Sequence, residues 1–237
     1  MTIIAIDSSA KAASVCIANE EKIIGEFFIN TSLTHSQTLM PMLEQLLKNT
    51  GMSVEQIGAV AVNAGPGSFT GVRIGVAAAK GLAFPKDLPC ISVSTLESMA
   101  YNLLDCDCIV CAVMDARCSQ VYNAMFKIKG NIAERLTEDR ALSLSDLLLD
   151  IKNYDEKVLL VGDGAEISYE FLKNCASNVF LAPQNKRVQT ASSVALSALK
   201  MLAEDKTVSA GELMPVYLRL PQAQRELNAR LNNKTES

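Results

Sequence analysis

The sequence predicts an α/β protein of two lobes that repeat one order of strands and helices. Two observations carry this prediction. Each half of the chain begins with an apolar run that ends in an aspartate, Asp7 or Asp115. Each run is followed by two hairpin strands and then by alternating helices and strands. Identity between the halves is poor, so the repeat is one of element order rather than of residues.

The first half justifies its elements in order. Strands are predicted over 2–7, 12–19 and 22–30, and the short Glu20-Glu21 link joins the last two as a hairpin. A helix is expected over 36–50, a strand over 57–63, and a glycine loop before a helix over 71–84. A strand over 89–93 and a helix over 95–104 complete this half.

The second half begins in the same way, with an apolar strand over 108–115. The pattern then predicts strands over 119–128 and 131–139, a helix over 143–152 and a strand over 157–161. Helices over 165–174 and 190–204 follow. The last 17 residues, 221–237, are polar and are interpreted as a frayed helix or tail.

This order of elements is that of two ribonuclease-H-like lobes in the actin-like ATPase architecture, with mixed sheets flanked by helices around a cleft. We assign 1–104 to an N-terminal lobe and 105–220 to a C-terminal lobe. Ligands of open α/β sheets bind beyond the carboxyl ends of strands, where Asp7, Asp115 and Gly65–Thr70 are expected. A two-lobed α/β protein with a vestigial cleft is the simpler alternative.

Composition excludes several classes of function. Hydrophobic residues make up 49% and charged residues 20%, which is typical of a soluble globular chain. The net charge of −4 disfavours a protein that binds nucleic acid alone, so any tRNA contact is expected only through a complex. No spanning helix and no signal peptide are expected, which favours a cytoplasmic protein without membrane contact.

Neither the cysteines nor the histidine predicts a metal site. Seven cysteines are expected to be reduced thiols, and the cluster of Cys106, Cys108 and Cys111 lacks the paired spacing of a zinc site. A single histidine, His35, excludes any mechanism that needs two imidazoles. It lies near a helix start, where an exposed or capping role is commoner than catalysis.

The clearest motif is the glycine loop at 63–75. Glycines there permit close backbone approach, and a helix start offers N–H groups to an anion. The loop lacks the Gly-Lys-Ser/Thr of a P-loop and the spacing of a nucleophile elbow. A tight connector and a vestigial nucleotide or phosphate site both stay open, and the site would use Asp7, Ser8, Gly65, Gly67, Ser68, Thr70 and Arg117.

Two helices of the first lobe carry excess apolar surface. The helix at 71–84 has only Arg73 and Lys80 on a narrow polar stripe. The apolar residues of the helix at 36–50 cover an arc of roughly 160°, wider than one core face requires. Burial in the core and partner binding are equally open. The predicted partner interface comprises Leu39, Met42, Leu43, Leu46, Arg73, Val76, Ala79 and Lys80.

Several motifs together resemble the bacterial TsaB family over residues 1–220. They are Asp7-Ser8-Ser9, the glycine loop 65–75, Ser94-Thr95-Leu96, Met114-Asp115-Ala116-Arg117 with Val121-Tyr122, and Pro215-Val216-Tyr217-Leu218-Arg219. The resemblance implies the actin-like ATPase fold. It also implies a non-catalytic scaffold that binds TsaD and enables TsaE to associate. TsaD adds a threonylcarbamoyl group to N6 of the adenosine next to the anticodon of tRNAs.

The same resemblance implies where this chain departs from TsaD. The metal-binding His-x₃-His pair of TsaD would fall near Thr95 and Met99, and Ala116 and Arg117 replace the phosphate glycines of the second lobe. No cofactor is expected for the isolated chain, although ATP or ADP at a subunit interface stays open. A homodimer is expected without TsaD. The alternatives are an autonomous nucleotide-dependent phosphotransferase using Asp7 and the glycine loop, or a peptidase.

Overall fold

The first sheet holds the N-terminal strands in the order β3-β2-β1-β4-β5. The computed structural model describes residues 1–117 and 119–219. β1 pairs antiparallel with β2 and parallel with β4, so the hairpin strands and the crossover strands share one mixed sheet. The strands are β1 (Ile3–Asp7), β2 (Ala13–Ala18), β3 (Ile23–Ile29), β4 (Ala59–Gly65) and β5 (Cys90–Ser94).

The second sheet repeats this arrangement in the order β11-β10-β6-β7-β8, with β9 paired to β7. β6 is antiparallel to β7 and parallel to β10, as β1 is to β2 and β4. The strands are β6 (Ile109–Asp115), β7 (Gln120–Lys129), β8 (Ile132–Arg135), β9 (Arg140–Ser143), β10 (Val158–Val161) and β11 (Val179–Leu181). The predicted two-lobed actin-like architecture is confirmed.

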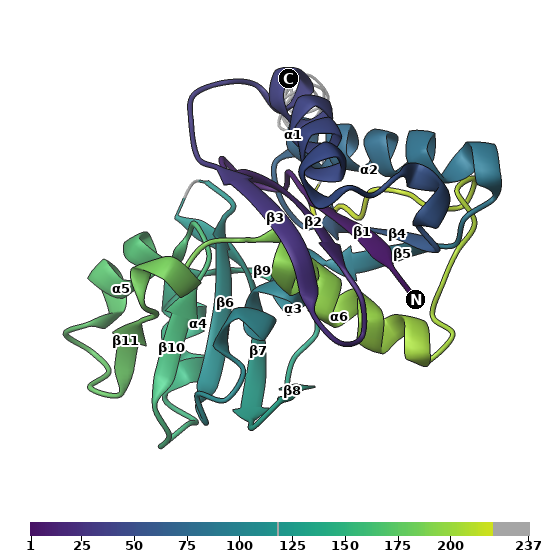
Figure 1. Cartoon of the computed structure of the whole chain (residues 1–237). Coiled ribbons are helices and arrows are strands. Elements are labelled where there is room, and N and C mark those ends of the chain that lie inside the picture. The colour runs from purple at the N-terminus through teal and green to yellow at the C-terminus, as the bar shows by residue number, and fades with distance from the viewer. Residues whose placement is uncertain (118, 220–237) are drawn as a thin grey trace, which may run out of the picture.

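Helices cover both faces of each sheet (Figure 1). α1 (His35–Thr50) and α2 (Phe69–Ala83) pack on the outer face of the first sheet. α6 (Ala191–Ala203) covers its inner face, and α3 (Thr95–Ala100) packs between α6 and the second sheet. α4 (Leu144–Ile151) and α5 (Ala165–Leu172) cover the other face of the second sheet.

The segment that follows the second lobe in sequence packs on the first lobe. α6 buries Ala191, Val194 and Ala198 against β1, β2 and β5, although it follows the second lobe in sequence. Residues 206–219, here called the C-terminal strap, continue along the first sheet, where Val208 bridges Cys90. The predicted C-terminal lobe therefore includes a segment, 191–219, that packs largely on the N-terminal sheet.

Short strands are where the pattern and the structure differ. The strand expected over 131–139 is shorter and ends at Arg135 as β8, while β9 at Arg140–Ser143 and β11 were not predicted. α1 runs through Pro41 without ending. The predicted tail at 221–237 lies outside the described residues. No helix in the described part of the chain is long and apolar enough to span a bilayer.

Candidate functional site

A cleft of about 560 Å³ opens between the two lobes. Its walls are the turn after β1 (Ser9–Lys11), the glycine loop (Pro66–Thr70), the end of β6 (Met114–Arg117), Asp163 and the strap (Val216–Arg219). The structure thus brings together Gly67, Ser68, Thr70 and Arg117 around one cleft, as the sequence predicts. Asp7, Ser8 and Gly65 do not line it, and Asp7 and Ser8 are buried.

The glycine loop packs tightly against the turn that follows β1. The Ser68 N–H donates to the Ser9 carbonyl at 2.7 Å. A Cβ on Gly67 would lie 2.4 Å from that carbonyl oxygen, and a Cβ on Gly71 would lie 2.1 Å from the Ser8 carbonyl oxygen. These glycines admit the protein's own backbone, which leaves that approach closed to a phosphate group. The geometry favours the tight connector.

Gly65 has the same role toward the strap. Its φ of +127° is accessible to glycine, and a Cβ there would lie 2.2 Å from the Val216 carbonyl oxygen. The Val216 N–H donates to the Ala64 carbonyl at 2.7 Å, which anchors the strap to the end of β4. The glycine at 65 is therefore explained by a contact with a residue far away in sequence.

Asp7 is 1% exposed at the carboxyl end of β1. Its Oδ1 accepts the Ser9 N–H at 2.8 Å. Burial raises the pKa of the Asp7 carboxyl, and the Ser9 and Asn63 groups beside it offset part of that rise. Ser8 turns the other way and donates its hydroxyl to the Gly71 carbonyl at 2.9 Å.

Two acids and an arginine lie at the ends of the corresponding strands of the second lobe, β6 and β10. Arg117 has φ +63°, and its N–H donates to Asp115 Oδ1 at 2.7 Å. Asp163 follows β10 and lines the cleft, where part of it stays exposed to solvent. Partial desolvation there raises the pKa of Asp163 to about 6, and the neighbouring Asp115 charge adds to the rise.

The strap lines the cleft and connects the two lobes. Val216 is bonded to the first lobe, and Arg219 Nη1 donates to the Ala116 carbonyl of the second lobe at 3.0 Å. The strap was missed as a functional element because its contacts with the two lobes are distant in sequence. The Pro215–Arg219 motif was the signal that could have located it.

Arg73 and Lys80, predicted to face a partner, are both tied to this strap. Arg73 Nε donates to the Tyr217 hydroxyl at 2.8 Å, and its guanidinium stacks 3.8 Å from the Phe69 ring centroid. The Phe69 and Tyr217 rings lie 4.8 Å apart. Lys80 Nζ donates to the Gly211 carbonyl at 3.3 Å. The polar stripe of α2 therefore holds the strap in place.

The remaining residues of the predicted interface are buried inside this chain, which corrects that part of the prediction. Each is at most 8% exposed in the core between the first sheet and its two outer helices: Leu39, Met42, Leu43, Leu46, Val76 and Ala79. The wide apolar arc of α1 is covered by β2, β3 and α2 together. These side chains are core residues, and a partner would meet other residues of the same helices.

The outward face of these two helices has a mixed character. On α1 the exposed residues are Ser36, Gln37, Met40, Pro41, Glu44, Gln45, Lys48 and Asn49. On α2, Arg73, Ala77 and Gly81 lie on one exposed stripe that ends at Phe84, which is 76% exposed. A Cβ on Gly81 would meet nothing within 4 Å, so a partner can approach this stripe closely. We call these residues the outer helical face.

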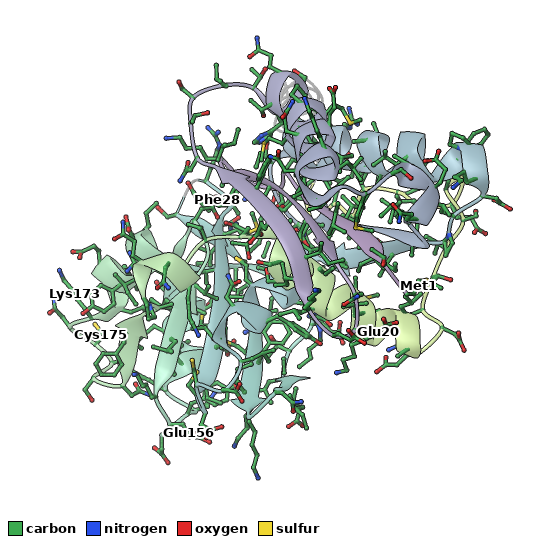
Figure 2. All side chains as sticks on the ribbon, in the orientation of Figure 1. Met1, Glu20, Phe28, Glu156, Lys173 and Cys175 are labelled. Carbon is green, nitrogen blue, oxygen red and sulfur yellow. The ribbon has the colours of Figure 1, made fainter. Side chains whose placement is uncertain are left out.

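Other predicted features have structural explanations. His35 Nε2 lies 2.8 Å from the Ala10 carbonyl oxygen and ties α1 to the turn after β1. Thr95 and Met99 are buried on α3. Within 1–117 and 119–219, no group of three or more His, Cys, Asp or Glu side chains is placed to hold a metal ion. Cys175 is exposed beyond α5, near Lys173 (Figure 2).

Comparisons with known proteins place this geometry in a family. Residues 24–227 match the family model of TsaD, described as tRNA N6-adenosine threonylcarbamoyltransferase. A Bacillus subtilis protein, "tRNA threonylcarbamoyladenosine biosynthesis protein TsaB", is 32% identical over 94% of this chain and 96% of its own length. The Escherichia coli protein of the same name is 33% identical over 92% of this chain and 95% of its own.

A solved structure agrees with these relatives. The solved structure described as "YeaZ from Pseudomonas aeruginosa" superposes with a TM-score of 0.79 and 25% identity. It covers 92% of this chain and 99% of that one. With the two-lobed fold in place and relatives above 30% identity along nearly their whole length, the chain belongs to the TsaB family.

Proposed function

We propose that this chain acts in tRNA threonylcarbamoyladenosine biosynthesis as a non-catalytic subunit that binds TsaD and thereby enables TsaE to associate. The observation that carries the proposal is the similarity to proteins of that pathway along almost the whole chain. The glycine loop supports the non-catalytic role. The Ser9 and Ser8 carbonyl groups already occupy the space beside Gly67 and Gly71, so the loop offers no open site for a phosphate group.

The outer helical face is the surface we propose for TsaD. Because the predicted apolar residues are buried, we propose that the exposed stripes of α1 and α2 make the contact. The small residues Ala77 and Gly81 allow a partner helix to approach, while Phe84 supplies exposed apolar area. In the absence of TsaD, we propose that a second copy of this chain covers the same face.

Reconstitution of the tRNA modification tests the subunit role. The mixture contains tRNA, TsaD, TsaE, the adenylate-forming enzyme, ATP, threonine and bicarbonate, with and without this chain. We expect product only when both this chain and TsaD are present. Product without this chain, or product from this chain without TsaD, would overturn the proposal.

A matched pair of variants tests the surface. Ala77→Arg places a long cation on the exposed stripe of α2, and Ala203→Arg places the same group on an exposed helical position of α6. We expect Ala77→Arg to weaken TsaD binding at least tenfold and Ala203→Arg to leave it unchanged. Equal binding by both folded variants, measured by calorimetry, would remove α2 from the interface while leaving the subunit role intact.

The remaining predictions concern nucleotide and tRNA. The cleft carries Lys11 and Arg117 beside Asp115 and Asp163, so its charges are mixed. We propose that the isolated chain needs no cofactor and that ATP or ADP, if bound, lies at an interface between subunits. We propose that tRNA is contacted only through the complex, in keeping with the net charge of −4.

A further inference from the structure

A row of buried polar side chains crosses the first sheet beneath the cleft. Ser14 on β2 is the register partner of Asp7 on β1, and Asn63 continues the parallel pairing of β1 with β4. Side chains alternate along strands, and the residues two places earlier, Ala5 and Ala61, face α6. The row Ser14–Asp7–Asn63 therefore lies on the inner face of the sheet, between the lobes.

Several polar atoms of this row and of the adjoining Ser9 make no hydrogen bond of normal length and angle with the residues that the structure describes, although the Ser9 and Asn63 side chains lie close enough to Asp7 to lower the pKa of its carboxyl. They are Asp7 Oδ2, Ser14 Oγ, both side-chain atoms of Asn63, and the Oγ of Ser9, whose N–H bonds to Asp7. All four residues are at most 1% exposed. Since a buried polar atom without a partner is costly, so many in one place indicate a bound species that contacts several of them.

The chemistry of the row selects the kind of species. Four of the atoms are oxygens: one carboxylate oxygen, two hydroxyl oxygens and one amide oxygen. Oxygen donors of this type suit alkali and alkaline-earth cations. A proton on Asp7 would pair with only one of the other oxygens, whereas a cation draws on all of them together.

The charge of the row favours a monovalent cation over a divalent one. The row holds one carboxylate, and none of the ion pairs found in 1–117 and 119–219 involves Asp7. A single positive charge neutralises a single buried carboxylate, while a divalent ion would leave an excess charge in the interior. We propose that Asp7, Ser9, Ser14 and Asn63 bind a monovalent metal cation, Na⁺ or K⁺, between the lobes.

Thermal unfolding of the full chain in matched salts tests the site. The salts are NaCl, KCl and tetramethylammonium chloride at one ionic strength, and the last supplies a cation too large to enter. We expect a saturable rise in Tm with Na⁺ or K⁺ of roughly 5–10 °C at a concentration 100-fold above the dissociation constant. The salt that acts at lower concentration identifies the cation.

Two variants serve as test and control. Asp7→Asn keeps the shape of the side chain but removes its charge, and it should lose the cation-dependent rise. Asp87→Asn changes an exposed aspartate at φ +50°, a conformation that asparagine tolerates, and should keep the rise. Equal Tm values for the wild type in all three salts would overturn the proposal and assign the row to ordered water or to a protonated Asp7.

A second measurement applies if Asp7→Asn fails to fold. Crystals of the wild type soaked in Tl⁺, a heavy analogue of K⁺, should show an anomalous peak among the four side chains. Ser14→Ala, which removes one donor, should weaken that peak and raise the cation concentration needed for half of the Tm shift several-fold. A wild-type crystal without a peak at this position would refute the site.

Discussion

Replacing Gly71 by alanine tests the tight packing between α2 and the turn after β1. The added Cβ would lie 2.1 Å from the Ser8 carbonyl oxygen, a backbone atom that cannot rotate away. Either α2 or the turn must shift, and overpacking of this kind costs ~1–3 kcal/mol. The shift would also strain the bond from the Ser8 hydroxyl to the Gly71 carbonyl, worth about 1 kcal/mol.

We therefore expect Gly71→Ala to lower the free energy of unfolding by roughly 2–4 kcal/mol. Gly81→Ala is the matched control, because it makes the same change in the same helix where a Cβ meets nothing within 4 Å. It should be neutral or stabilising by up to ~1 kcal/mol, since alanine favours helix more than glycine does. Urea denaturation measures both, and equal stability of the two variants would refute the packing argument.

Three further outcomes follow from the site and the interior. The pKa of Asp163 is raised to about 6 in the folded protein, so the folded protein keeps a proton that the unfolded chain releases from about pH 4 upward. The free energy of unfolding therefore falls as pH rises from about 4 to 6. Asp163→Asn should reduce this fall, measured by urea denaturation at about pH 4.5 and 7, and the buried Asp7, whose pKa is also raised, should account for part of what remains. Arg135 forms ion pairs with Glu97 and Asp139, and its guanidinium lies 4.8 Å from the centroid of the Phe126 ring. Arg135→Ala should therefore lower the free energy of unfolding by ~2 kcal/mol. An unchanged calorimetric Tm would contradict this expectation. Burial raises the pKa of the Cys111 thiol to about 12, while Cys175 is exposed, so iodoacetamide followed by mass spectrometry should find Cys175 modified and Cys111 unmodified in the native protein.

The long elements could be predicted because their residues alternate with the periods of helices and strands. Short strands could not, and β11 with three residues carries too few positions for a period to show. The predicted interface was wrong in its residues for a related reason. An apolar arc indicates that a helix face is covered but does not indicate whether the same chain or a partner covers it. Leu46 on α1 is covered by this chain.

The glycine loop shows what a motif leaves open. Its sequence indicates that something approaches the backbone closely, which is compatible with a phosphate or with another part of the chain. Which of them approaches depends on where the Ser8-Ser9 turn and Val216 lie after folding. Val216 is separated from Gly65 by most of the chain, so no local pattern contains that information.

The return of α6 to the first sheet has a consequence for synthesis on the ribosome. The strands of that sheet are complete once Ser94 has been made, yet the helix that covers Ile3, Ala5 and Ile91 begins only at Ala191. Domains commonly fold in order as they emerge. Here the first half of the chain must wait, with one apolar sheet face exposed, until the second half has been translated. This protein is therefore expected to depend on chaperone protection during translation more than its modest length would suggest.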